Sequence, residues 1–165
     1  MPKFTYVPKD YSRDAIIYLA GIVDGEGALV ISKHSSKHKS GYNYQARLEI
    51  SNTVKGLCDW IQKNFGGTVS AYTRNQTPKN ARKTVYRWLC QGERLTHICE
   101  LIYPFSVIKQ EEIKTILEMR YRLQKPVSFK GKQGVQSLQQ SELDARHQLF
   151  LKLKSLHNRS YVNKK

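Results

Sequence analysis

Two carboxylates stand where an apolar helical run ends. Residues 18–27 read Tyr-Leu-Ala-Gly-Ile-Val-Asp-Gly-Glu-Gly, so Asp24 and Glu26 alternate with glycines. The C-terminal end of a helix carries the negative pole of its dipole and favours basic side chains. Acidic groups there point to a bound cation, and oxygen ligands suit Mg²⁺. The pattern therefore indicates a divalent-metal site with Glu26 as its main ligand. The alternative is a helix that ends in a Gly-rich turn with a solvated Glu26.

Glycine spacing in the same run predicts a close helix contact. Gly21 and Gly25 lie four residues apart and therefore share one helix face. Each costs roughly 1 kcal/mol relative to Ala inside a helix. Because glycine has no side chain, this face of the helix lets the backbone of a second helix approach closely. We therefore expect this helix to pack tightly on another helix and to bring the acidic groups to a shared point.

The stretch Leu19-Ala20-Gly21-Ile22-Val23-Asp24-Gly25-Glu26-Gly27 resembles the signature of the LAGLIDADG homing endonucleases. The match has no gap, and Glu replaces the final Asp, a substitution that the family itself uses. The resemblance covers about residues 14–124. It implies an αββαββα fold, cleavage of both strands of DNA with a divalent metal and short 3′ overhangs. It also implies a homodimer with paired motif helices, and an origin inside an intron or intein; at this size we expect a free-standing, intron-encoded protein.

The resemblance also implies individual site residues. The Gly25 carbonyl lies beside Glu26 at a metal site for Mg²⁺, which Mn²⁺ or Ca²⁺ can also occupy. Asn52 falls where members place a polar residue that orients water, and Lys109 matches the lysine that follows a Pro-Phe turn. Asp24 is expected to cap the partner helix or to buttress the interface. The predicted catalytic residues are Glu26, Asn52 and Lys109, and the predicted dimer interface contains Tyr18, Ala20, Gly21, Asp24 and Gly25.

Composition favours a polyanionic partner. The chain of 165 residues has 28 Lys and Arg against 13 Asp and Glu, a formal net charge of +15. Such an excess favours nucleic acid or an anionic membrane surface. The longest apolar run, Ala15–Val23, is far shorter than the ~20 residues of a membrane span, so we expect no membrane partner.

Cys58, Cys90 and Cys99 are odd in number and form no Cys-x-x-Cys pair, which predicts free thiols in a reducing compartment. No secretion signal is evident at the N-terminus, so we expect an organelle or a prokaryotic cytoplasm.

Periodicity predicts the elements that must position these groups. A helix capped by Ser12 should run to about Val23, followed by a strand over 29–34 and a clearly alternating strand that ends near Asn52. Further helices are expected over 54–65, 93–102, 107–124 and 141–157, with strands over 68–74 and 84–91. Hairpins without alternating βα units predict an α+β fold, in which one face of an antiparallel four-stranded sheet is covered by helices. We expect one domain over 1–165, with a core over about 12–124 and a helical extension over about 137–157.

The open face of that sheet is predicted to be a DNA-binding saddle. Arg suits guanine, Asn and Gln suit adenine, and Glu suits cytosine; the alternative is an ordinary solvated sheet face. The predicted contacts are Ser32, His34, Lys37, Asn43, Gln45, Arg47, Glu49, Ser70, Tyr72, Arg74, Tyr86 and Trp88. Placing Tyr86 and Trp88 there turns Arg87 toward the helices, where a buried Arg needs a partner. The facing of that strand therefore stays open.

These observations predict a site-specific, metal-dependent endonuclease that acts as a homodimer on double-stranded DNA. Two other functions fit the same basic sheet. One is a maturase that binds its own intron RNA, and the other is a DNA-binding regulator that has lost cleavage. An acid at a DNA-facing helix end has no use in a pure binder, which argues against the regulator.

Overall fold

A computed structural model describes residues 9–35, 42–73, 83–124 and 139–162, with side chains up to 158. The element order begins with α1 (Arg13–Glu26), β1 (Gly27–Ser35), β2 (Tyr42–Asn52) and α2 (Lys55–Phe65). A second ββα block follows: β3 (Thr68–Thr73), β4 (Thr84–Gln91) and α3 (Gly92–Ile102). The 3₁₀ turn η1 (Tyr103–Phe105) leads to α4 (Gln110–Gln124) and α5 (Gln140–Val162). The predicted αββαββα order with C-terminal helices is confirmed.

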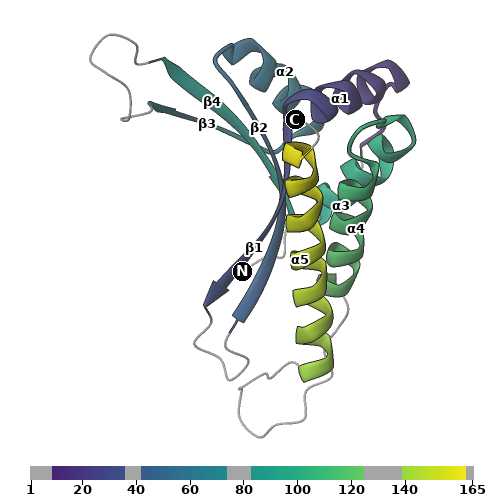
Figure 1. Ribbon diagram of the computed structural model, residues 1–165. Helices are drawn as coiled ribbons and strands as arrows, with labels where there is room; N and C mark the ends of the chain where they lie inside the picture. Colours follow the sequence, from purple (N-terminus) through teal and green to yellow (C-terminus); the bar gives the residue numbers. More distant parts are fainter. Residues whose placement is uncertain (1–8, 36–41, 74–82, 125–138, 163–165) are drawn as a thin grey trace, which may run out of the picture.

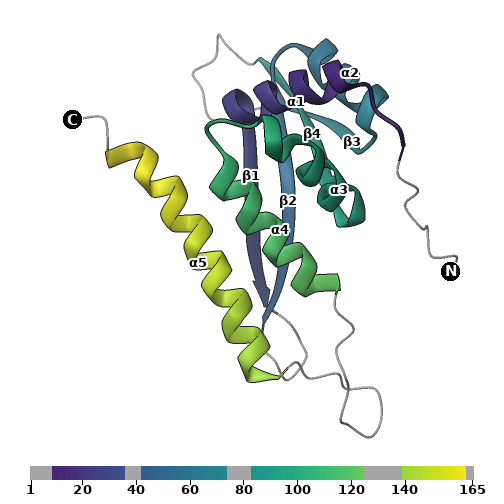
Figure 2. The ribbon, with the colours of Figure 1, turned by 90° about the vertical axis from the view of Figure 1, so that its right-hand side faces the viewer.

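The four strands form one antiparallel sheet in the order β1-β2-β4-β3. Figure 1 shows the sheet as a curved layer with the helices on one side only, and the view of Figure 2 looks onto that helical layer. Because β2 and β4 are the inner strands, their outward side chains form the floor of the concave face. The predicted α+β architecture with one open sheet face is therefore confirmed.

Alternation along β2 explains why one face is covered. Ala46, Leu48 and Ile50 are almost fully buried, whereas their neighbours on the strand remain partly exposed. Helix α1 lays Leu19, Ala20 and Val23 against this apolar face, and α2, α3 and α4 add their own buried stripes. Each Å² of apolar surface removed from water contributes about 25 cal/mol of stabilisation. This layer is therefore the main stabilising contact of the fold.

Three helix boundaries differ clearly from the predicted ones. Helix α5 runs to Val162, beyond the predicted end near His157. The other two differences have a local reason. Helix α1 is capped by Ser12, whose Oγ accepts the Ala15 N–H at 3.2 Å, but it continues to Glu26 rather than stopping near Val23. The acidic residues therefore occupy the last turn itself. Helix α4 begins at Gln110 rather than at Val107, since the backbone before it is held by Asp24.

Helix α2 ends in a glycine turn that makes room for a tryptophan. Gly66 and Gly67 have φ values of 72° and 88°, which L side chains rarely adopt. A Cβ on Gly67 would lie 2.6 Å from Nε1 of Trp88. That Nε1 donates to the Gly66 carbonyl at 2.7 Å. Trp88 is fully buried as a result, on the helix-covered face of β4.

Candidate active site and nucleic-acid interface

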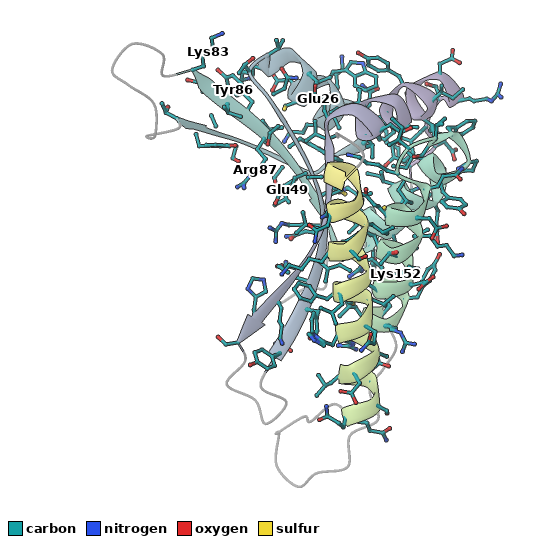
Figure 3. The ribbon with its side chains drawn as sticks, in the orientation of Figure 1. Glu26, Glu49, Lys83, Tyr86, Arg87 and Lys152 are labelled. Carbon is teal, nitrogen blue, oxygen red and sulfur yellow. The ribbon has the colours of Figure 1, made fainter. Side chains whose placement is uncertain are left out.

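The motif helix passes directly into the first strand. Helix α1 ends at Glu26 and β1 starts at Gly27, so the acidic end of the helix stands at one end of the sheet. A Cβ on Gly27 would lie 2.6 Å from the Val23 carbonyl oxygen, so this junction requires glycine. Glu26 is exposed at the corner, as Figure 3 shows. Its carboxylate and the last carbonyls of α1 offer the oxygen donors that a hard cation binds.

Asp24 holds the segment that leads into α4. Its Oδ1 accepts the Ser106 hydroxyl at 2.5 Å and the Lys109 N–H at 3.1 Å. Its Oδ2 accepts the N–H groups of Val107 and Ile108 at 2.7 and 3.2 Å. Burial alone would raise the pKa of this carboxyl, but the four hydrogen bonds outweigh that effect and leave the pKa below its ordinary value. The prediction that Asp24 caps the partner helix is therefore wrong, since both oxygens are engaged within the same chain.

Lys109 is brought to the same corner by this arrangement. Its backbone is fixed by Asp24, and its Nζ donates a hydrogen bond to the Gly27 carbonyl. Gly27 directly follows Glu26, so the Lys109 ammonium binds the backbone of the residue next to the exposed Glu26, at the junction of α1 and β1. These two predicted catalytic side chains come from residues more than 80 positions apart.

Asn52 lies at the same end of the sheet. The register pairs Gly27 with Ile50, so the end of β2 stands beside the start of β1. Asn52 Oδ1 accepts the Val54 N–H at 2.8 Å, which forms the turn into α2. The side chain is thus anchored near the corner through its oxygen. Its role in orienting water stays a prediction.

The open face of β1 and β2 carries a hydrogen-bonded polar network. Arg47 Nε donates to Glu49 at 2.5 Å, and its Nη1 donates to Ser32 Oγ at 2.9 Å. His34 Nε2 lies 2.9 Å from the same hydroxyl. Gln45 donates to Gln91 of β4 at 2.9 Å, and Asn43 stands opposite His34 in the ladder. These predicted contact residues therefore share the concave face.

The structure settles the facing of β4 against the predicted contacts Tyr86 and Trp88, which lie on the helix-covered side. The ladder pairs Trp88 with the buried Ile50, and Tyr86 shares its face and packs against the core. Arg87 pairs instead with Ser51 and Ser70 on the open face. Figure 3 shows Tyr86 and Arg87 on opposite sides of the strand. The cause is the Gly66–Gly67 turn described above, which accommodates the Trp88 indole in the helical layer.

The remaining predicted contacts divide between the described sheet and other segments. Ser70 and Tyr72 are exposed on β3 and follow the register of the open face. Lys83, which is not among the predicted contacts, is exposed directly before β4. Lys37 and Arg74 lie outside the described residues.

The outer side of α1 is apolar and carries both motif glycines. A Cβ on Gly21 or Gly25 would meet nothing within 4 Å, and Tyr18 is 57% exposed. Val107 and Ile108, which Asp24 holds beside this helix, are 85% and 75% exposed. Ala20 is fully buried in the core of its own chain, so its predicted place in a dimer interface is wrong.

Comparison with known families decides the classification. The model of the family described as LAGLIDADG endonuclease matches residues 19–105, more than half of the chain. The chain belongs to the LAGLIDADG endonuclease family. No curated protein matches it. Among the described residues, no helix is long and apolar enough to cross a membrane.

Solved structures of homing endonucleases share the fold at low sequence identity. The homing endonuclease I-CvuI, solved with its target and Ca, is 20% identical with a TM-score of 0.66, over 87% of this chain and 82% of that one. The archaeal intron-encoded homing endonuclease I-Vdi141I, solved with DNA, is 15% identical with a TM-score of 0.67, over 87% and 84%. The homing endonuclease I-TnaI is 16% identical with a TM-score of 0.61, over 91% and 96%. The likeness spans most of each chain.

Proposed function

We propose that this protein is a site-specific homing endonuclease that hydrolyses both strands of a double-stranded DNA target. The observation that carries the proposal is the corner where α1 meets β1. There an exposed Glu26 and the Lys109 ammonium stand at the end of a concave, polar sheet face. Family membership and DNA-bound structural neighbours support the same activity.

Each residue has a distinct task in this proposal. Phosphates of the cleaved strand reach the corner while the duplex lies along the concave face. Lys109 stabilises negative charge that develops on the phosphate, and the Asn52 amide orients the attacking water. The polar side chains of β1, β2 and β3 contact base edges. The net charge of +15 supplies sequence-independent attraction to the DNA backbone.

A divalent cation fits the donors at this corner. Glu26 and the Gly25 carbonyl are oxygen ligands, and neither Mg²⁺ nor Ca²⁺ requires nitrogen or sulfur. When bound there, such a metal would polarise the phosphate and lower the pKa of water. Solved relatives were crystallised with Mg or Ca, which supports the same choice. Mn²⁺ is expected to substitute.

Two chains are needed for two cuts. One chain contributes one Glu26, and a two-fold axis along the outer side of α1 places a second corner beside the first. Gly21 and Gly25 permit close approach there, and the exposed Tyr18, Val107 and Ile108 supply apolar surface. We therefore propose a homodimer. Its origin in an intron, and a reducing compartment for its buried thiols, belong to the same proposal.

The decisive experiment compares cleavage with binding. The full chain is incubated with a randomised duplex library and Mg²⁺, and the cut ends are sequenced. On the selected site, Glu26→Gln should abolish cleavage while changing affinity by less than about tenfold, since base and phosphate contacts supply the affinity. Asp14→Asn, an exposed acid at the other end of α1, is the matched control and should cut like wild type. Undiminished cutting by Glu26→Gln, or no site-specific cutting by wild type, would contradict the proposal.

A further inference from the structure

Arg87 lies on the floor of the concave face and makes no ion pair with an acidic side chain among the described residues. It sits on the inner strand β4, between Ser51 of β2 and Ser70 of β3. Its Nε is buried and has no hydrogen-bond partner among the described residues. Its guanidinium faces the ring of Tyr72, with Cζ 5.8 Å from the ring centroid. A buried donor without an acceptor costs free energy in the isolated chain.

Arg47 on the same face provides a direct contrast. Its guanidinium is engaged by the Glu49 carboxylate at 2.5 Å and by Ser32 at 2.9 Å. The charge of Arg47 is therefore balanced within the protein, and two of its N–H donors are already engaged. Arg87 has no carboxylate in a comparable position among the described residues, so its terminal nitrogens can serve an external acceptor.

We propose that Arg87 determines specificity by pairing with a guanine in the inner part of each half-site, with Tyr72 as the residue that positions it. This inference rests on the proposed function. Arginine pairs with guanine through two parallel hydrogen bonds to O6 and N7. A position on the floor of the face, rather than at a hairpin rim, suits a base edge better than a phosphate.

The register sets where along the half-site this guanine lies. Arg87 pairs with Ser51, the neighbour of Asn52, at the end of the sheet that holds Glu26. Arg47 pairs with Gln91, four residues farther along the ladder. At ~3.3 Å per residue, the two arginines are offset by ~13 Å, or about four base pairs at 3.4 Å per step. Arg87 therefore reads the pair nearer the cleavage point.

Tyr72 limits the freedom of the guanidinium before DNA arrives. An aromatic face next to an arginine favours a small set of rotamers through a cation–π contact. Binding costs less free energy when the side chain that makes the contact is already held in its bound orientation. Tyr72→Phe should keep this effect and Tyr72→Ala should remove it, because the ring rather than the hydroxyl faces Arg87.

The test is a base-preference profile of two matched variants. The full chain carrying Glu26→Gln, so that bound DNA stays intact, selects duplexes from a randomised library. Adding Arg87→Gln should change the preference at one inner position per half-site from guanine toward adenine, with a 5- to 150-fold loss of affinity for the guanine site. Arg47→Gln, the matched control, should leave the guanine preference at that inner position unchanged, because Arg47 lies about four base pairs farther out.

Two further readouts separate this role from other roles of an arginine. Arg87→Gln should leave the slope of log K against log salt nearly unchanged, whereas losing a phosphate contact would reduce it by about 0.9. Its thermal midpoint should stay close to that of the parent chain, because the removal of a buried N–H without an acceptor offsets the loss of the contact with the Tyr72 ring. An equal loss on all sequences or an unchanged profile would each overturn the assignment of Arg87 alone. Absence of any selected site for the parent chain would overturn the proposed function with it.

Discussion

At the residue scale, the Asp24 carboxylate connects the motif helix to the segment that carries Lys109. It accepts the Ser106 hydroxyl and three consecutive backbone N–H groups, those of residues 107–109. Ser106 itself is only 2% exposed, so its hydroxyl depends on this acceptor. The first acid of the motif therefore organises the protein, while the carboxylate of the second, Glu26, stays exposed.

Asp24→Asn should destabilise the protein and weaken cleavage more than binding. The amide keeps the shape but replaces one acceptor oxygen with a donor, which faces N–H groups. We expect a loss of about 2 kcal/mol in the free energy of unfolding at pH 7, measured by urea denaturation. Cleavage at the selected site should fall at least tenfold because Lys109 is no longer fixed, with a smaller effect on affinity. Equal losses in both would contradict a positioning role.

The pH dependence of this effect has a defined sign. Because the folded pKa of Asp24 lies below its ordinary value, the stabilisation is complete above the unfolded pKa near 4. It is lost as the pH falls through the folded pKa. The difference between wild type and Asp24→Asn should therefore shrink below about pH 4. Asp59→Asn, which removes an exposed ion pair with Lys55, is the control and should leave the free energy of unfolding almost unchanged at any pH, since solvent screens this pair.

Local chemistry predicted Glu26, and the family resemblance implied Lys109, but neither indicated the partners of Asp24. The acid–glycine pattern at a helix end is visible in nine consecutive residues. Asp24 and Ser106, by contrast, are separated by 82 residues. Nothing in the sequence near Asp24 indicates which chain supplies its donors. A backbone N–H leaves no trace in residue type, so three of its four partners are invisible before folding.

At the scale of elements, strands are predictable where their two faces differ. On β2, apolar Ala46, Leu48 and Ile50 alternate with polar neighbours, and the predicted facing holds in the structure. On β4 both faces carry apolar side chains, since Val85 and Leu89 flank Arg87 while Trp88 and Cys90 lie opposite. In such a strand, the periodicity of apolar residues does not indicate which face turns toward the helices. The glycine turn that admits Trp88 decides the facing.

Helix α5 gives an element-scale prediction. It packs on α4 and β1, and Glu142 accepts from Arg146 at 3.0 Å and from Arg122 of α4 at 2.8 Å. Arg146 is 6% exposed, so Glu142→Gln leaves a buried guanidinium without its counter-charge. We expect a loss of about 3 kcal/mol in unfolding free energy, measured by chemical denaturation.

A matched control lies on the same pair of helices. Glu118 of α4 and Lys152 of α5 are 4.0 Å apart and both about two-fifths exposed. Because exposed pairs contribute little, Glu118→Gln should change stability by less than about 1 kcal/mol. Similar losses for Glu142→Gln and Glu118→Gln would show that α5 is held by its apolar stripe alone.

At the scale of the whole molecule, two surfaces with different chemistry meet at Glu26. The concave sheet face is polar and extends from the α1–β1 corner to the far ends of β1 and β2 (Figure 1). The outer side of α1 is apolar and carries glycines with open space in front of them. Strand residues 43–51 span ~26 Å, or about eight base pairs. Two copies joined at α1 would thus cover roughly 20 base pairs of a partly palindromic site.

Replacing one motif glycine should separate self-association from folding. Gly21→Gln places a side chain on the outer side of α1 where a Cβ meets nothing within 4 Å, so it should not disturb the single chain. Helix propensity should raise the stability of the monomer by about 1 kcal/mol. The same side chain should block close approach of a second α1, so sedimentation equilibrium should show weaker dimerisation and double-strand cleavage should decline. Gly56→Gln on α2, an exposed glycine with equally open surroundings, should stabilise the chain without affecting association. A Gly21→Gln protein that dimerises as tightly as wild type would show that the α1 glycines do not face a second copy.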